Sequence, residues 1–177
     1  MGLKLSVEFS ASYHHELLEL AKKDLSLAHI KQHSDAAQIA VNLAKIYNIV
    51  AGGYSVQKPG ETVVFDQGYI TGKKLWVSNI PHSSYVVLGV LENEKKIMVL
   101  VEITDSAQVD MVPTVGMENT HTGHIVFEQH PAIKLFDYHN NPTSFQLQHQ
   151  VALGFLTNHY GLCLALFNDI DQYTQSA

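Results

Sequence analysis

The sequence predicts an α+β protein in which N-terminal helices precede a central antiparallel β-barrel and one long C-terminal helix follows it. Three observations favour this class. Apolar residues recur at helical spacing in the first third of the chain, short alternating runs broken by glycine and proline fill the middle, and a long apolar run follows Pro142. We therefore expect a helical segment at 1–59, a barrel domain at 60–141 and a helix at 142–177.

The first third predicts two helices. Ser12 is placed to cap the first, and Asp35 with Gln38 forms a plausible capping box for the second, which we expect to end at Gly52-Gly53. The apolar faces of the two helices are Leu17, Leu18, Ala21, Leu25 and Ala28, then Ile39, Leu43, Ile46 and Val50.

The middle of the chain predicts antiparallel sheet. From Tyr85 to Leu91 both alternating faces are apolar, which is typical of a buried strand. A polar turn at 92–95 separates this strand from Ile97, Val99 and Val101, so the two runs form a hairpin. We expect about six to eight strands, a usual size for a small barrel.

Pro142 occupies a first-turn position and opens the last helix. The apolar run from Val151 to Phe167 is short for a membrane span, contains a polar patch and lacks basic flanks, so we expect no membrane insertion. The exposed apolar area of a lone terminal helix predicts a homodimer or higher closed oligomer through this helix. Cys163, the single cysteine, is expected to be a small buried hydrophobe, and a lone cysteine favours a reducing, cytoplasmic setting.

Charge excludes one class of partner. The net charge is -6, and all 11 basic residues are lysine. Nucleic-acid binders need a basic surface and usually arginine forks, so we expect no nucleic-acid partner.

Eleven histidines suggest a metal site, but the pattern is weak. His29 and His33 have helical i, i+4 spacing without the glutamate of a zincin motif, and His121 and His124 are expected in loops. No nucleophile elbow, dinucleotide fingerprint or Walker loop is present. We therefore predict no metal and leave the catalytic residues unassigned.

Trp76 is the strongest binding candidate from the residues alone. It is the only tryptophan, and Ser78 lies two residues on, where a strand places side chains on the same face. An indole ring beside a hydroxyl can stack on a planar heterocycle and bond to its polar edge. The alternative is that Trp76 belongs to the core.

At these residues the chain resembles the acyl-CoA dehydrogenase superfamily. Its middle-domain pattern G-Y-x-x-x-G-x-K-x-W-[IV]-[TS]-N is matched from Gly68 to Asn79, and Val112 to Phe127 is similar to its glycine-methionine and threonine segment. Ala51 to Gly60 lacks the usual T-E-P motif and looks more like the flavin-dependent monooxygenase branch. Val151 to Leu156 resembles the first helix of the family's C-terminal bundle.

The resemblance implies a flavoprotein oxidoreductase acting on an acyl-CoA or small aromatic, with a reduced or incomplete active site. FAD or FMN would contact Trp76, Val77 and Ser78, and its pyrophosphate would bind backbone donors or lysines such as Lys73. Where some family members carry a catalytic glutamate, this chain has Ser144 or Phe145. The alternative is a catalytically silent binding or assembly module with the same barrel.

Overall fold

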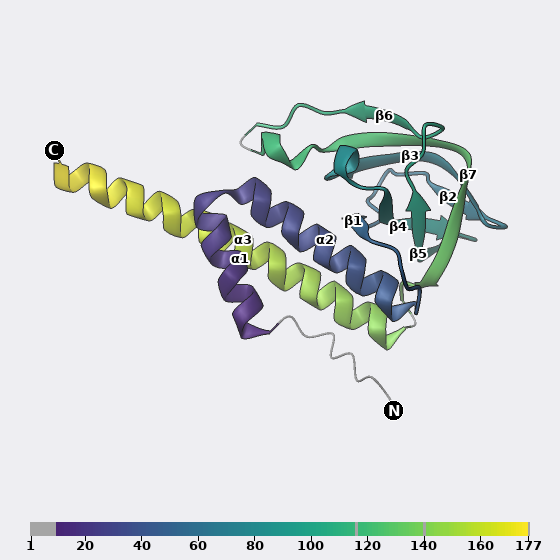
Figure 1. The fold of residues 1–177 in the computed structure, drawn as a ribbon, viewed down its shortest axis with the longest axis horizontal. Coiled ribbons are helices and arrows are strands. Elements are labelled where there is room, and N and C mark those ends of the chain that lie inside the picture. Colours follow the sequence, from purple (N-terminus) through teal and green to yellow (C-terminus); the bar gives the residue numbers. More distant parts are fainter. Residues whose placement is uncertain (1–9, 116, 140, 177) are drawn as a thin grey trace.

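The computed structural model describes residues 10–115, 117–139 and 141–176, and confirms the predicted order of helices, barrel and helix. Helices α1 (Ala11–Lys23) and α2 (Leu25–Leu43) precede the strands, and α3 (Pro142–Ser176) follows them. Figure 1 shows the three helices together on one side of the barrel, with the C-terminal part of α3 projecting beyond the rest of the molecule.

Five strands form a closed ring in the order β4-β2-β3-β7-β5, because β5 pairs back with β4. Strand β1 adds to β4, and β6 adds to β7. The strands are β1 (Ala51–Ser55), β2 (Val64–Asp66), β3 (Tyr69–Val77), β4 (Tyr85–Glu92), β5 (Lys95–Glu102), β6 (Gln108–Met111) and β7 (Gly123–Asp137). Two short 3-10 turns, η1 (Ile80–His82) and η2 (Glu118–Thr120), flank the barrel.

The sheet is mixed, which corrects the expectation of a wholly antiparallel barrel. Strands β1 and β2 both run parallel to β4, while the other pairings are antiparallel. Strand β1 pairs with Tyr85 to Leu88 of β4 and β2 with Leu91 farther along it, so the chain runs along β4 in one direction through both strands.

The predicted helix boundaries were wrong in three places. Ser10, not Ser12, caps α1, since its side chain accepts a hydrogen bond from the Tyr13 backbone. Asp24 caps α2, and Asp35 lies inside that helix, paired with Lys31 at 3.1 Å. The Gly52-Gly53 pair lies in β1 instead of ending a helix, and glycine is required at 52 because a Cβ there would collide with the Ser83 hydroxyl.

The central hairpin is confirmed. Strands β4 and β5 pair in register from Tyr85 with Glu102 to Glu92 with Lys95, around a two-residue turn at Asn93-Glu94. Both turn residues have positive φ, as a two-residue hairpin turn requires. One face of β4 (Val86, Leu88, Val90) fills the barrel, and Val87 on the other face packs with the helices.

Helix α3 approaches α1 and α2 closely through two glycines. A Cβ at Gly154 would meet the Gln32 side chain at 2.8 Å, and one at Gly161 would meet Ala21 at 2.8 Å. Gln32 is fully buried, donates to the Val151 carbonyl at 2.7 Å and accepts from Asn158 at 2.8 Å. This polar clamp fixes α2 against α3.

The opposite face of α3 is exposed, and Cys163 lies on it. The prediction of a buried thiol was therefore wrong, because the run around it is apolar on a face that the described residues leave exposed. Among the described residues, Ser144–Gln172 is one stretch long and apolar enough to cross a membrane by length and composition, a test that core helices of soluble proteins also pass.

Candidate functional site

A cavity of about 540 Å³ opens between the barrel, α2, α3 and the segment that leads into η2. Its size is in the range of ordinary ligand pockets. Most of its wall is apolar or aromatic, with hydroxyl and imidazole groups on one side. The lining residues are His29, His33, Tyr54, Ser55, Val56, Lys58, Trp76, Ser78, Pro113, Thr114, Val115, Met117, Thr120, Thr122, Val151 and Phe155.

Trp76 and Ser78, which we expected on one strand face, both line this cavity. Trp76 has 46% of its surface exposed and a positive φ of 54°, at a bulge where the β3–β7 register shifts. It is therefore not a core tryptophan. The third predicted contact, Val77, lies in the barrel core and is not among the lining residues, because the strand turns its side chain to the other face.

A chain of hydroxyl groups continues from Ser78 along the cavity. Its Oγ lies 3.1 Å from His29 Nε2 and 3.1 Å from Thr122 Oγ1, which in turn lies 2.8 Å from Thr120 Oγ1. Thr120 also donates to the Met117 carbonyl at 2.8 Å. Since a hydroxyl both donates and accepts, this chain can hold a ligand's polar edge and pass a proton along it.

His29 and His33 stack with their ring centroids 4.1 Å apart and an interplanar angle of 35°. Burial, aided by the charge of Lys58, lowers the pKa of His29 to about 4, and burial lowers the pKa of His33 well below its usual value. Both imidazoles are therefore neutral at pH 7. The described residues contain no group of three or more metal-ligating side chains, and these two histidines interact with each other and with Phe155.

His33 is buried, and among the described residues neither of its ring nitrogens makes a hydrogen bond of good geometry. A hydrogen bond with the Tyr54 backbone raises its pKa, against the larger effect of burial. Buried polar groups are almost always paired in folded proteins. An unpaired imidazole on a cavity wall is therefore a position where a ligand can supply the missing partner.

The basic group at the cavity is Lys58 rather than the predicted Lys73, which is exposed on β3 and does not line it. Desolvation lowers the pKa of Lys58, while Glu61 acts in the opposite direction. The Lys58 backbone donates to Glu61 Oε2 at 2.7 Å, so the segment that presents this lysine is anchored to the barrel.

That anchor is a buried ion pair. Lys74 on β3 donates to Glu61 at 2.6 Å and to the carbonyls of Val56 and Gly89 at 2.7 and 2.9 Å. Glu61 also accepts from the Leu75 backbone at 3.0 Å. Burial lowers the pKa of Lys74 to about 8, against the stabilising carboxylate of Glu61. Every proton of this ammonium has an acceptor, so the pair holds the 56–61 segment in place.

Sequence reasoning missed most of the cavity. His29 and His33 were considered only as metal ligands, and Tyr54 was not singled out. Thr120 and Thr122 lie in the Val112 to Phe127 segment that resembles the family, but no role was assigned to either residue. His124, expected in a loop, lies in β7, where its Nδ1 accepts from the Trp76 backbone at 3.2 Å. Of the two positions aligned with the family's glutamate, Ser144 is buried and Phe145 exposed, and neither lines the cavity.

No protein-family model matches the sequence, and no curated protein is similar to it in sequence. Solved structures are similar in fold. Glutaryl-CoA dehydrogenase from Mycobacterium smegmatis, in complex with FADH2, has a TM-score of 0.76 over 94% of this chain at 13% identity, and butyryl-CoA dehydrogenase from Megasphaera elsdenii 0.72 over 92% at 14%. KijD3, in complex with FMN and a dTDP-linked sugar, has 0.67 over 88% at 15%.

The fold is that of the acyl-CoA dehydrogenases and related flavin enzymes. This confirms the resemblance drawn from Gly68 to Asn79. The chain spans about half the length of these structures: 50% of the glutaryl-CoA dehydrogenase, 52% of the butyryl-CoA dehydrogenase and 47% of KijD3. Identities this low show the fold alone.

Proposed function

We propose that this protein is a flavin-binding oxidoreductase of acyl-CoA dehydrogenase type, with FAD or FMN held in the 540 Å³ cavity. The observation that carries the proposal is the placement of Trp76 and Ser78 on one wall, with the Ser78 hydroxyl 3.1 Å from His29. An isoalloxazine ring has flat faces and one polar edge, so an indole and a row of hydroxyls fit it. Flavins found in structures of this fold support the choice.

In this arrangement Trp76 covers a face of the ring, and Ser78 bonds to its polar edge. His29 is neutral because burial lowers its pKa to about 4, so it orients the Ser78 hydroxyl by a hydrogen bond without bringing a charge to the ring. Lys58 supplies a positive charge to a phosphate or to a reduced, anionic ring. When bound, the flavin supplies the hydride or oxygen chemistry.

The cavity favours a small aromatic substrate over an acyl-CoA. Dehydrogenation of a thioester needs a base that removes the α proton, and no aspartate or glutamate is among the described residues that line the cavity. Phe155 and Tyr54 instead offer aromatic surface beside the unpaired His33, which suits a ring with a polar substituent. The same shortage of carboxylates favours the second candidate, a catalytically silent binding module with this barrel.

Titration of the purified protein with FAD and with FMN tests the proposal. Trp76 is the only tryptophan, so a ring stacked on it quenches the protein's indole fluorescence. We expect dissociation constants no tighter than about 1 μM, because among the described residues that line the cavity Lys58 is the one lysine or arginine available to a pyrophosphate. Absence of quenching by either flavin at about 1 mM contradicts flavin binding, whereas quenching without turnover of any aromatic supports the silent module.

Two serine variants form a matched pair for this titration. Ser78→Ala removes a hydroxyl bonded to His29 at 3.1 Å, and Ser106→Ala removes one bonded to His130 at 3.2 Å outside the cavity. Each variant loses a serine–histidine hydrogen bond. We expect Ser78→Ala alone to weaken flavin binding, by about tenfold, the effect of one hydrogen bond of about 1.4 kcal/mol. Equal effects of the two variants contradict a direct contact of Ser78 with the ring.

A further inference from the structure

Strand β3 carries a bulge beside the cavity, where it lies next to β7 (Figure 1). The register of the two strands shifts between Lys74 and Val77, so Leu75 and Trp76 of β3 both lie opposite His124 of β7. A bulge of this kind takes residues out of the ladder and re-aims a side chain. Trp76 has a left-handed φ of 54°, which is uncommon for a bulky residue. Such a conformation persists only where its surroundings hold it.

Two side chains accept hydrogen bonds from the backbone of this bulge. The Leu75 N–H donates to Glu61 Oε1 at 3.0 Å, and the Trp76 N–H donates to His124 Nδ1 at 3.2 Å. In a regular strand such donors bond to the backbone of a neighbouring strand, so these two acceptors replace the ladder where the register shifts. Glu61 serves the residue before the indole, and His124 serves the residue that carries it.

His124 also contacts the indole ring. The ring centroids of His124 and Trp76 lie 5.2 Å apart, at an interplanar angle of 88°. Edge-to-face contact is a favoured arrangement of two aromatic rings. His124 is not among the residues that line the cavity, so it makes both contacts from outside. One imidazole therefore supports the backbone and the side chain of Trp76 without meeting a ligand in the cavity.

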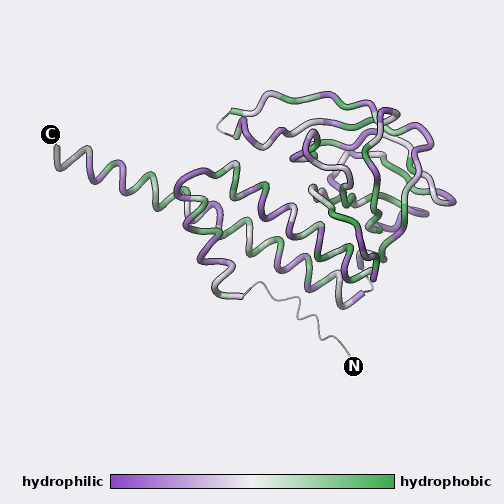
Figure 2. The backbone as a smooth tube through the Cα atoms, in the orientation of Figure 1, coloured by the Kyte–Doolittle hydropathy of each residue, from purple (hydrophilic) through white to green (hydrophobic). Residues whose placement is uncertain are grey.

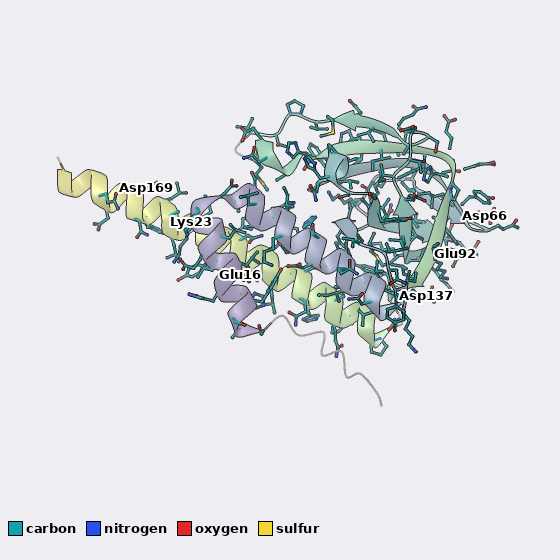
Figure 3. The ribbon with its side chains drawn as sticks, in the orientation of Figure 1. Glu16, Lys23, Asp66, Glu92, Asp137 and Asp169 are labelled. Carbon is teal, nitrogen blue, oxygen red and sulfur yellow. The ribbon has the colours of Figure 1, made fainter. Side chains whose placement is uncertain are left out.

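The acceptor at the bulge is a ring nitrogen and not a carboxylate. Because Nδ1 accepts, the proton of the neutral imidazole is on Nε2. Figure 3 shows the carboxylates Asp66, Glu92 and Asp137 on the side of the barrel where β3 begins, whereas the bulge is near the end of β3. Hydrophilic and hydrophobic residues are interspersed along the barrel strands (Figure 2), and His124 directly precedes the buried Ile125.

We propose that His124 is a positioning residue, which holds the Trp76 indole at the cavity in the orientation that stacks on a planar ring. The identity of that ring rests on the flavin binding proposed above, but the conformation of Trp76 is measurable without any ligand. Without the Nδ1 acceptor the left-handed conformation of Trp76 loses its hydrogen bond. A ligand must then order the indole as it binds, and that ordering lowers its affinity.

Three variants separate the two contacts of His124. In His124→Asn the side-chain oxygen takes the place of Nδ1 and keeps the acceptor. His124→Phe keeps an aromatic edge without an acceptor, and His124→Leu has neither. His139→Leu is the matched control, because His139 makes an edge-to-face contact with Tyr138 at the same 5.2 Å and does not line the cavity.

Near-ultraviolet circular dichroism of the ligand-free protein is the first measurement. Trp76 is the only tryptophan, so the indole bands report on its immobilisation alone. We expect His124→Leu and His124→Phe to lose most of this signal. His124→Asn and His139→Leu should keep it, and the far-ultraviolet spectra of all four variants should match the wild type. Unchanged indole bands in His124→Leu, or equal losses in His124→Asn and His124→Leu, would overturn the proposal.

Titration with FMN is the second measurement. His124→Leu should weaken binding by about tenfold, whereas His124→Asn should stay within about twofold of the wild type. Unchanged FMN affinity in a His124→Leu protein that has lost its indole bands would also overturn the positioning role. If the wild type itself binds no flavin, the proposed function fails, while the spectra of the ligand-free variants still decide whether His124 positions Trp76.

Discussion

Two buried polar clusters of this molecule differ in how completely their polar atoms are hydrogen-bonded. Lys74 and Glu61 are both shielded from solvent, and each ammonium proton finds an acceptor within 2.9 Å. His33 is buried as well, yet within the described residues it has only the Tyr54 backbone as a partner and makes no hydrogen bond of good geometry. The first cluster closes a loop onto the barrel, and the second faces a cavity.

The difference teaches how to distinguish a scaffold from a site. Burying a polar group is costly unless it is paired, so a cluster that exists for stability is expected to be complete in itself. A cluster that exists for a ligand is complete only when the ligand is bound. Lys74 with Glu61 fits the first description, and His29 with His33 and Ser78 fits the second.

The largest loss of folding stability is expected from breaking the buried ion pair between Lys74 and Glu61. Glu61→Gln leaves Lys74 without its carboxylate in a site shielded from solvent, and Lys74→Met leaves the Glu61 carboxylate without its cation. Each should lower the free energy of unfolding by about 3–5 kcal/mol, as measured by urea denaturation. Lys134→Met is the control, since Lys134 pairs with Glu92 at the same 2.6 Å but at a partly exposed site, and should cost less than about 1 kcal/mol. Similar losses in the buried and exposed pairs would contradict the assignment of Lys74 as the anchor.

A smaller loss of folding stability is expected when the pH is lowered. The unfolded chain protonates His29 near pH 6.5, whereas the folded protein keeps it neutral until about pH 4. The unfolded state therefore binds more protons in this window, and stability falls as the pH falls through it. His29 alone should contribute a loss of about 1–2 kcal/mol between pH 7 and pH 5.

Denaturation midpoints measured across this pH range check the effect. Burial also holds the pKa of His33 well below its usual value, so His33→Phe should reduce the acid sensitivity. His15→Phe, at an exposed histidine, is the control, because it also removes one imidazole. If His33→Phe leaves the slope of stability against pH unchanged, the buried histidine pair is not what makes the fold acid-sensitive.

The smallest effect on stability is expected at Trp76. Its side chain is half exposed and outside the barrel core, so Trp76→Phe should change the free energy of unfolding by no more than about 0.5 kcal/mol. Calorimetric titration should nevertheless show several-fold weaker flavin binding, because the smaller ring stacks over less area. A large loss of stability with unchanged affinity would place Trp76 with the structural cluster instead.

How far the sequence predicts this protein depends on how local each signal is. The β4–β5 hairpin was correctly predicted because alternation and a two-residue turn are read within 18 residues. The start of α2 was placed at Asp35 instead of Leu25. Asp24 is the single residue between α1 and α2, so the sequence shows almost no break between the two helices. Residues such as Trp76 and Ser78 were found because they are neighbours in the chain.

The sequence by itself determined the class of fold, the barrel between helices and an indole two residues from a hydroxyl, since each follows from spacing along the chain. Only the tertiary structure decided what faces that indole. It brought His29 from α2 to Ser78 across 49 positions, placed Thr122 at the same wall and turned Val77 into the core. Such contacts form only when the barrel closes and the helices pack against it. Because closure and packing involve the whole chain, no local sequence pattern encodes these contacts.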